Sequence, residues 1–481
     1  MKYIISVDFW KKLAKHVATD PRMELPVTFI RRNSVWYLDD IQQVKGKWTE
    51  TTGLLLVMNS LELLEKYRPD IFPVQQIFIP VYVDTKRYQF YHNLYVIRNG
   101  SVQWSNPRTV HVDLAQLIDP VEMLRGTAKN NLILMKYRHL PTVDLEKVFG
   151  TKCLILGTGT LGCHIALDLL SWGVESMTFV DNAHVSHSNL LRQCLFEFAD
   201  IGLPKAEAAV RRITAIYPPA TGKVKGVQLQ IPMPDHAETS CDMEEKVGML
   251  EQLVSSHDLT FLCTDNKESR WLPTLVAVNQ NKPLINLAVG FDSWVVMRHP
   301  LTDPDTKYWS DNNWSRVSVE NMGCYFCTSV EGVSNTTRDR QIDERCTVTR
   351  GGTASVAGAY AVELAVTLLT HPQGFHASGE ICNNVASSCP LSTVCPPQQI
   401  RGSIRLFNTN QCISRRNPQC CACSTHVSVY YRDAIAKFKF LENVCRDSAI
   451  LKTITALDQY EIASTRDNIL EVADEAPRAT D

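Results

Sequence analysis

The chain has 481 residues, of which 44% are hydrophobic and 21% charged, and its formal net charge is −2. This length predicts two or three domains with a substantial core, and the near-zero charge excludes bulk binding of nucleic acid or of membranes as the main task. No stretch reaches the roughly 20 apolar residues of a membrane span, so we expect a cytoplasmic protein without stable membrane insertion.

The chain contains 16 cysteines, which is a high number for a protein of this kind. A reducing compartment disfavours disulfides and directs attention to metal binding and catalysis. Cys153 and Cys263 stand in apolar runs and are typical of small core residues.

Residues 1–133 predict a mixed α/β domain without a nucleotide signature. Residues 54–67 have helical spacing, residues 76–83 alternate like a strand, and residues 110–124 are typical of a strand followed by a helix. Residues 134–150 are predicted to be a linker. Recruitment of a protein partner is a role that this domain could have, although its residue types do not prove it.

A glycine-rich turn follows an apolar run at 152–156 and precedes a helical pattern. Gly157, Gly159 and Gly162 have the spacing that lets a backbone turn tightly, approach a phosphate and pack a helix on a strand. Asp181 ends the next predicted strand, where a carboxylate suits ribose hydroxyls. These features indicate a nucleotide site, and a dinucleotide-dependent dehydrogenase is the first interpretation.

The region from 150 to 290 alternates predicted strands and helices, which is typical of an α/β fold with a doubly wound, Rossmann-like parallel sheet. Helices are expected at 160–172 and 205–216. Further strands are expected at 224–231, at 259–265 with Asp265 at its carboxyl end, and at 284–289.

Three charged residues change the choice of nucleotide. Arg192 and Lys205 supply cations for phosphates, and Asp265, after a strand, supplies an oxygen ligand for a hard metal. ATP with Mg²⁺ needs both kinds of group, whereas a nicotinamide dinucleotide needs no metal ligand. The alternative is that Arg192 and Lys205 are solvated cations at helix ends.

This set of residues resembles the adenylation site of the ubiquitin-activating enzyme superfamily. The strings at 231–236, 268–273 and 290–299 are similar, more narrowly, to the autophagy-type activating enzymes of ubiquitin-like modifiers, and the resemblance covers about residues 130–435. It implies an adenylation domain at 151–435, followed by a C-terminal helix and tail at 436–481.

The resemblance also implies roles for single residues. Asp181 would hold the ribose, Arg192 and Lys205 the phosphates, and Asp265 the magnesium ion. Asn189 and Gln193 would line the pocket, and Arg270 would lie near the nucleotide or the modifier tail. For each residue the alternative is a local cap or ion pair.

Two Cys-x-x-Cys pairs predict a metal site. Four thiolates at such spacing can close the coordination sphere of one structural zinc ion. The number of residues between the two pairs is, however, larger than in a compact zinc ribbon. The family has a structural zinc at the matching positions, which implies the ligands Cys324, Cys327, Cys420 and Cys423. Cys421 remains an alternative to Cys420.

Cys346 lies in an arginine-rich stretch that contains Arg338, Arg340, Arg345 and Arg350, and cationic neighbours favour a thiolate nucleophile. A long apolar helix is expected to follow at 353–369. A passive cysteine in a solvated charge run is the alternative. The stretch resembles the catalytic-cysteine segment of the family, except that glycines follow Arg350 where the family usually has proline.

Beyond that helix, residues 378–397 read as a flexible insertion, 399–402 as a strand, 427–444 as a helix and 474–481 as a disordered tail.

The family resemblance implies a homodimer that adenylates ubiquitin-like autophagy modifiers, carries them as a thioester on Cys346 and passes them to conjugating enzymes. The N-terminal domain of the family recruits the conjugating enzyme, and here that segment is about half the usual length. The alternatives are a sulfur-carrier-protein adenylyltransferase and a non-catalytic dimeric scaffold.

Overall fold

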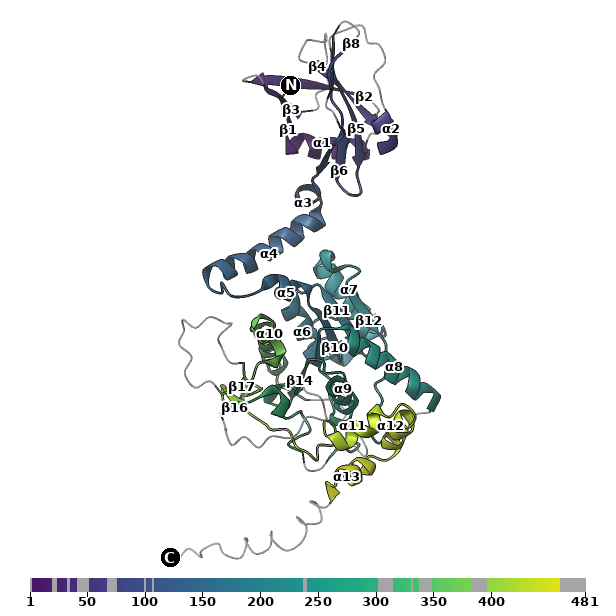
Figure 1. Ribbon diagram of the computed structural model, residues 1–481, viewed down its shortest axis with the longest axis vertical. Helices are drawn as coiled ribbons and strands as arrows, with labels where there is room; N and C mark the ends of the chain where they lie inside the picture. The colour runs from purple at the N-terminus through teal and green to yellow at the C-terminus, as the bar shows by residue number, and fades with distance from the viewer. Residues whose placement is uncertain are drawn as a thin grey trace, which may run out of the picture. The chain divides into compact units, whose positions relative to one another are not determined.

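The computed structural model describes residues 2–19, 24–32, 35–40, 52–66, 76–98, 101–105, 108–236, 240–301, 315–329, 332–336, 348–381 and 396–458. They form two compact units, an N-terminal unit up to Asn130 and a C-terminal unit from Asn131 onward (Figure 1). Each unit is described by itself.

The N-terminal unit is built on a nine-stranded sheet with the order β1-β3-β2-β4-β5-β6-β9, in which β7 pairs with β5 and β8 with β7. Its strands are β1 (Lys2–Ile5), β2 (Glu24–Arg32), β3 (Val35–Asp40), β4 (Thr52–Met58), β5 (Gln76–Asp84), β6 (Gln89–His92), β7 (Tyr95–Arg98), β8 (Ser101–Ser105) and β9 (Val110–Asp113). Its helices are α1 (Val7–Thr19), α2 (Leu61–Lys66) and α3 (Ala115–Ile118). Helix α1 buries Phe9, Trp10 and Leu13 in the core of the unit.

The predicted strand at 76–83 and the strand and helix at 110–124 are confirmed. The helix predicted at 54–67 is wrong for its first half, because β4 pairs with β2 and β5 there and only α2 is helical. A short apolar run such as 54–57 does not distinguish a strand from a helix by its spacing.

Helix α4 (Pro120–Arg138) spans the division between the units, and α5 (Leu145–Gly150) follows it. The segment predicted to be a linker, 134–150, therefore contains the last turn of α4 and the whole of α5. Asp144 caps α5 by accepting a hydrogen bond from the backbone N–H of Lys147.

The C-terminal unit contains an eight-stranded sheet with the order β12-β11-β10-β13-β14-β15-β18-β19. Its strands are β10 (Lys152–Leu156), β11 (Ser176–Val180), β12 (Val224–Val227), β13 (Leu259–Leu262), β14 (Leu284–Val289), β15 (Ser293–Arg298), β18 (Gln399–Ser403) and β19 (Asn408–Cys412). Strands β10 to β14 are parallel, and β15, β18 and β19 add an antiparallel edge. This confirms the predicted doubly wound α/β sheet, although β12 ends before the predicted residue 231.

Helices cover both faces of this sheet, and Figure 1 shows them around it. One face is covered by α5 with α6 (Thr160–Ser171), α7 (Lys205–Ile216) and α10 (Thr353–Thr370), and the other by α8 (Ser240–Ser256), α9 (Lys267–Asn279), α11 (Thr425–Arg432), α12 (Lys437–Arg446) and α13 (Ala449–Thr455). In β10, Cys153 and Ile155 enter the first core and Leu154 and Leu156 the second. A strand buried on both faces therefore reads as one apolar run.

The single helix predicted at 427–444 is wrong, because the chain breaks between α11 and α12. Asp433 leaves the helical conformation, and its carboxylate accepts hydrogen bonds from the backbone N–H groups of Ile435 and Ala436. One aspartate thus ends a helix and supports the start of the next.

Smaller elements complete the described chain. Strands β16 (Arg316–Val317) and β17 (Gly379–Glu380) form a separate pair, and 3-10 turns occur at His187–Asn189, Phe198–Asp200, Pro218–Ala220, Val319–Asn321 and Gly374–His376. Most of the predicted insertion at 378–397 and the predicted tail at 474–481 lie outside the described residues.

Helix α10 is the one helix in the described ranges that is long and apolar enough to cross a membrane. Its most apolar 18-residue window is 61% buried inside the protein. It packs against α6, β14 and β15, so its apolar composition serves the core.

Candidate functional site

A cavity of about 520 Å³, which we name the loop cavity, lies at the carboxyl ends of β10, β11, β13 and β14. This is the edge of an open parallel sheet at which ligands bind. All the residues that the sequence predicts to bind nucleotide, except Gly162, line it: Gly157, Gly159, Asp181, Asn189, Arg192, Gln193, Lys205, Asp265 and Arg270.

The glycine-rich turn has two steric constraints. Gly157 has a φ of +96°, and a Cβ there would lie 3.0 Å from the backbone carbonyl of Cys263. At Gly162 a Cβ would lie 2.1 Å from the carbonyl oxygen of Gly157. Gly162 therefore packs α6 against the turn, while Gly157 and Gly159 face the cavity.

Asp181 connects the end of β11 to the glycine-rich turn. Its carboxylate accepts hydrogen bonds from the backbone N–H groups of Thr158 at 2.7 Å and Ala183 at 2.8 Å. Each carboxylate oxygen retains a second acceptor position, so the side chain can also receive hydroxyl groups.

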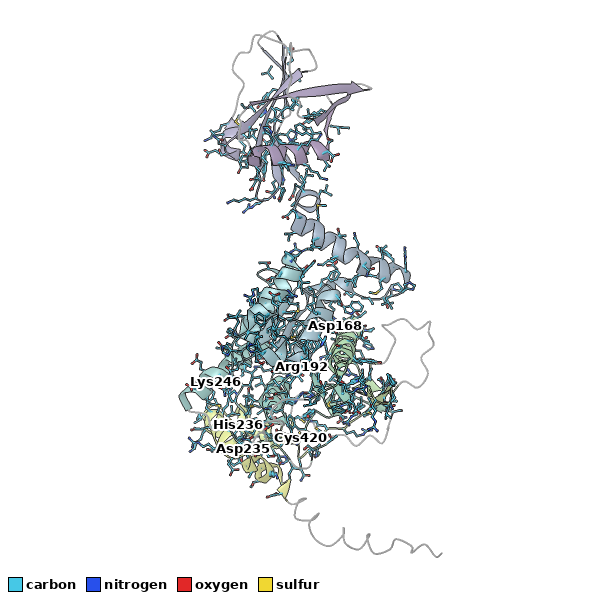
Figure 2. The ribbon with its side chains drawn as sticks, turned by 180° about the vertical axis from the view of Figure 1, so that it is seen from behind. Asp168, Arg192, Asp235, His236, Lys246 and Cys420 are labelled. Carbon is cyan, nitrogen blue, oxygen red and sulfur yellow. The ribbon has the colours of Figure 1, made fainter. Side chains whose placement is uncertain are left out.

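The turn from Ser186 to Gln193 forms a second wall. Asn189 accepts a hydrogen bond from the backbone N–H of Ser186 at 2.9 Å, and Arg192 donates to the carbonyl of Ser188 at 3.0 Å (Figure 2). Both side chains thus make local hydrogen bonds, as the alternative of a purely local role requires. Both also line the cavity.

Two buried polar atoms in the cavity wall lack a protein partner among the described residues. They are Oε1 of Gln193, a side chain that is 4% exposed, and Oγ1 of Thr264. Buried polar atoms are nearly always hydrogen-bonded, so these two indicate a polar ligand or water in the cavity.

Lys205 begins α7, and Asp265 lies in the turn after β13. Within the described part of the chain, neither side chain has an ion-pair partner. A cation and a carboxylate that both face open cavity space can engage phosphate and a hard metal ion respectively.

Arg270, on α9, is buried and bound by the protein. Its guanidinium donates to the side chain of Asn286 at 2.6 Å and to the carbonyls of Leu287 and Thr264, and it lies 5.3 Å from the ring centre of Tyr325. Burial lowers the pKa of Arg270. Arg270 thus holds the turn after β13 against β14 and shapes the wall.

A second cavity of about 620 Å³, which we name the strand cavity, shares Lys267, Ala288 and Tyr325 with the loop cavity. Its other lining residues include Val295 of β15 and Arg401 of β18. The sequence analysis missed these residues. The position of Lys267, two residues after Asp265, could have indicated that it lines a cavity. That residues of β15 and β18 also line the strand cavity follows only from the antiparallel pairing of these strands.

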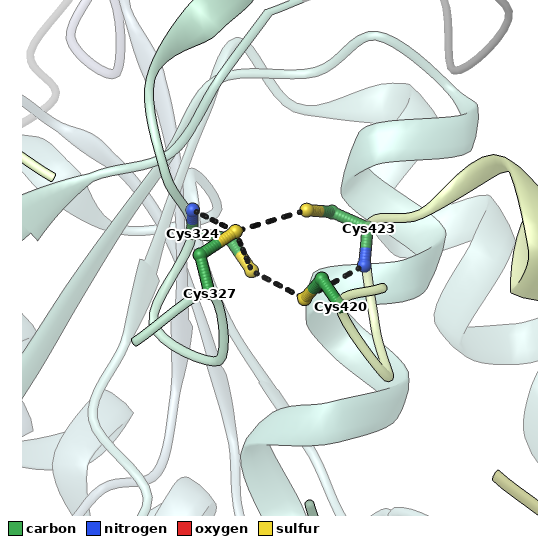
Figure 3. Close-up of side chains that lie close together, drawn as sticks. All are labelled: Cys324, Cys327, Cys420 and Cys423. Atoms are coloured by element: carbon green, nitrogen blue, oxygen red, sulfur yellow. Dashed lines mark hydrogen bonds between the residues drawn. The ribbon is translucent and has the colours of Figure 1, made fainter. Parts of the chain in front are cut away.

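Four buried cysteines form a compact group (Figure 3), which we name the cysteine quartet: Cys324, Cys327, Cys420 and Cys423. Their sulfur atoms all lie within 4.8 Å of one another, with separations of 3.5 Å for Cys324–Cys420, 3.4 Å for Cys327–Cys423 and 3.7 Å for Cys324–Cys327. Four sulfurs at about 2.3 Å from one zinc ion would lie about 3.8 Å apart. The quartet therefore fits a tetrahedral metal site.

Backbone N–H groups surround the quartet. Cys327 Sγ accepts from the N–H of Cys324 at 3.2 Å and of Asn417 at 3.4 Å, and Cys420 Sγ accepts from Ala422 at 3.4 Å. Such donors stabilise thiolates. Cys421 lies outside the quartet, and its carbonyl accepts from the indole of Trp271 at 2.8 Å.

Cys346 and the arginines 338, 340 and 345 lie outside the described residues. On one side of that segment, Thr336 donates its hydroxyl to the fully buried carboxylate of Glu268 at 2.9 Å. On the other side, Thr349 lines the loop cavity and the N–H of Arg350 bonds the carbonyl of Phe291 at 2.8 Å. The segment that contains Cys346 therefore rejoins the described chain at the edge of the loop cavity.

Three curated relatives share the name ubiquitin-like modifier-activating enzyme ATG7. The protein from Rattus norvegicus is 39% identical over 387 residues, 76% of this chain and 55% of its own length. That from Homo sapiens has the same identity and coverage, and that from Cryptococcus neoformans var. neoformans serotype D (strain B-3501A) is 40% identical over 72% of this chain and 52% of its own length. The chain thus spans about half the length of the curated relatives it matches.

Among solved structures, E. coli MccB with MccA-N7isoASN is similar at a TM-score of 0.42 and 21% identity, over 63% of this chain and 74% of that one. The ThiF family model matches residues 133–399, which is more than half of the chain. That match contains the parallel strands β10 to β14 and the turns that line the loop cavity. The chain belongs to the ThiF family.

Proposed function

We propose that this protein activates ubiquitin-like modifiers of autophagy by adenylating their C-terminal carboxylate with ATP and Mg²⁺. The observation that carries the proposal is the loop cavity, in which Lys205 and Asp265 have no ion-pair partner and Oε1 of Gln193 has no hydrogen-bond partner among the described residues, beside a glycine-rich turn. The names of the relatives, given above, supply the class of substrate.

In the first step, a carboxylate oxygen of the modifier attacks the α-phosphorus of ATP, and pyrophosphate leaves. Asp181 receives the ribose hydroxyls, and Arg192 and Lys205 offset the charge on the phosphates. Asp265 would hold Mg²⁺, which supplies further charge neutralisation when bound. An exposed carboxylate that has no ion-pair partner within the described part of the chain fits a hard cation of this kind.

The strand cavity would receive the C-terminal tail of the modifier. It adjoins the loop cavity through Lys267, Ala288 and Tyr325, so a chain lying in it would bring its end towards the nucleotide. Val295 of β15 and Arg401 of β18 lie in its wall, and because both strands are already paired on both sides, side chains and not strand pairing would hold the tail.

In the second step, the Cys346 thiolate attacks the acyl carbon, a thioester forms and AMP leaves. The position of Thr349 in the wall of the loop cavity supports a short path between the two centres. A conjugating enzyme would then accept the modifier on its own cysteine.

We also propose that the cysteine quartet holds one structural zinc ion. The sulfur separations and the backbone donors support this assignment. Such an ion would join the segment after β15 to the start of α11 and take no part in the chemistry.

The homodimeric state, the cytoplasmic location and recruitment of the conjugating enzyme by the N-terminal unit complete the proposal. The dimer and the recruitment rest on the family resemblance, and the cytoplasmic location rests on the sequence composition discussed above. Analytical ultracentrifugation of the whole chain, with and without ATP, tests the dimer, because a monomer under both conditions contradicts it.

One experiment tests the reaction. The protein is incubated with ATP, Mg²⁺ and ubiquitin-like modifiers and run on gels with and without reductant. We expect an adduct that reductant removes and that becomes resistant in Cys346→Ser, while the control Cys412→Ser keeps the sensitive adduct. Pyrophosphate exchange without an adduct would favour a sulfur-carrier adenylyltransferase, and the absence of both signals would favour a scaffold.

A further inference from the structure

A second group of sulfur atoms lies at the other face of the sheet from the quartet, because Cys163 belongs to the core that α6, α7 and α10 cover. Cys194 is exposed, and its sulfur lies 3.9 Å from Nδ1 of His164 on α6. The other ring nitrogen of His164 lies 3.2 Å from the hydroxyl of Ser355 on α10. The imidazole is thus held between a thiol and a hydroxyl.

Helix α10 keeps this imidazole in place through close packing. A Cβ at Gly358 would lie 3.2 Å from Cβ of His164 and 3.5 Å from a carboxylate oxygen of Asp168, so the two helices approach closely there. Asp168, one turn beyond His164 on α6 (Figure 2), adds a carboxyl group to the site.

A buried thiol adjoins the exposed one. Cys163 is 0% exposed, and its thiol is close enough to that of Cys194 to lower the pKa of Cys194. The Cys163 sulfur also lies 3.8 Å from the carbonyl oxygen of Thr158, in the glycine-rich turn. One exposed and one buried cysteine therefore share a site with an imidazole.

The charges in this site favour a thiolate. The adjacent Cys163 thiol and the neighbouring His164 lower the pKa of Cys194 to about 5. The hydrogen bond with Cys194 raises the pKa of His164, while burial raises that of Cys163, which stays a thiol. Asp168 favours the imidazolium, although burial raises the pKa of its own carboxyl to about 6. A thiolate, and not a thiol, reacts with peroxides and electrophiles.

We propose that Cys194 is a peroxide-sensitive modification site, in which His164 is the positioning residue that holds the thiolate and Cys163 is the resolving thiol. The Cys194 sulfur attacks one oxygen of hydrogen peroxide, the O–O bond breaks, and a sulfenic acid and hydroxide form. The Cys163 sulfur then attacks the sulfenic sulfur, a disulfide forms, and water leaves with the thiol proton. Overall, two thiols lose two electrons and peroxide is reduced to water.

The pH dependence of alkylation tests the thiolate. The Cys346→Ser protein is treated with iodoacetamide, and each cysteine is followed by mass spectrometry, with the partly exposed Cys412 as the internal reference. A low pKa increases the fraction of thiolate but makes each thiolate a weaker nucleophile. We therefore expect Cys194 to react about tenfold faster than Cys412 at pH 6 and at about the same rate at pH 7. Its rate should be nearly constant above pH 6, because a thiolate that has already formed gains nothing from a further rise in pH.

His164→Gln should lower the rate of Cys194 at pH 6 about tenfold and restore a rising pH profile. His426→Gln, at an exposed histidine on α11, is the matched control and should change neither. Parallel pH profiles for Cys194 and Cys412, or an unchanged profile in His164→Gln, would overturn the proposal.

Peroxide treatment tests the resolving thiol. Peptide mapping without reductant should find a Cys163–Cys194 disulfide, and Cys163→Ala should instead accumulate a dimedone adduct on Cys194. Replacing the buried Cys163 can prevent folding. In that case Cys194→Ser provides the second measurement, because it should also lose the disulfide. If the protein with both cysteines forms a dimedone adduct but no disulfide, the role of Cys163 is contradicted. If Cys194 does not react at all, the whole proposal is contradicted.

Discussion

The loop cavity and the cysteine quartet lie in the same unit, but their polar groups are satisfied to different degrees. In the quartet the sulfurs contact one another, and backbone N–H groups donate to Cys324, Cys327 and Cys420. In the loop cavity, Gln193 and Thr264 retain buried atoms without partners in the described chain. A permanent structural centre is completed by the fold, whereas a substrate cavity leaves groups for a molecule that enters and departs.

The largest expected effect is at the quartet. Cys420→Ala should abolish zinc binding and destabilise the protein by about 5 kcal/mol, or about 10 °C in Tm, because a broken metal site leaves two distant segments unlinked. The matched control is Cys421→Ala, which removes an adjacent buried thiol outside the quartet and should cost about 1 kcal/mol. Metal content and thermal unfolding measure both. Equal losses in the two variants would contradict a metal-bound quartet.

The next effect is at the loop cavity and concerns binding. Asp181→Ala should weaken ATP binding about 100-fold, since it removes the proposed ribose acceptor and releases the N–H groups of Thr158 and Ala183. Asp258→Ala is the control, because Asp258 bonds the N–H of Lys152 at the other end of the same sheet. Titration of a fluorescent ATP analogue measures both. Unchanged affinity in Asp181→Ala would remove Asp181 from the site.

Lys205→Ala should weaken ATP binding about tenfold, and the loss should shrink as salt is added, because a partly exposed charge is screened. Lys225→Ala, at an exposed position of β12, should leave the affinity unchanged. The same titration at two ionic strengths distinguishes them. Equal losses of ATP affinity in the two variants would mean that the net surface charge, and not a specific contact of Lys205, determines the affinity.

The smallest effect concerns Asp168, beside the Cys194 and His164 pair. Burial raises the pKa of its carboxyl to about 6, so its contribution to stability is complete below about pH 4 and is lost as the pH rises through 6. Asp168→Asn should therefore be about 1 kcal/mol more stable than the parent at pH 7.5 and equal to it at pH 4, after allowance for solvent screening. Urea unfolding at both pH values measures this. Asp292→Asn, at a partly exposed site, is the control, and a gain that persists at pH 4 would contradict the mechanism.

The sequence predicted the parts of the site that chain-local rules control. Strands such as β10 and β13 read as apolar runs because both faces are buried, and Gly157 and Asp181 follow such runs directly. A ligand edge follows from that pattern, since the carboxyl ends of parallel strands meet. The paired cysteines were equally visible, because a metal site needs fixed ligand spacing.

Features that depend on tertiary pairing were not predictable. The strand β4 was taken for a helix because only its pairing with β2 and β5 distinguishes the two. The strand cavity needs β15 and β18 to meet, and the contact between His164 and Ser355 joins residues 191 positions apart. No local spacing rule reports such contacts.

With zinc bound, the quartet would turn part of the chain into a closed ring, because Cys324 and Cys420 are 96 positions apart. The ring includes Cys346 and α10. A single protease cut within it would leave two fragments that remain tethered through the metal until a chelator is added. The segment that contains Cys346, which we propose to receive the modifier, would then stay attached to the rest of the protein after a single cut beside it.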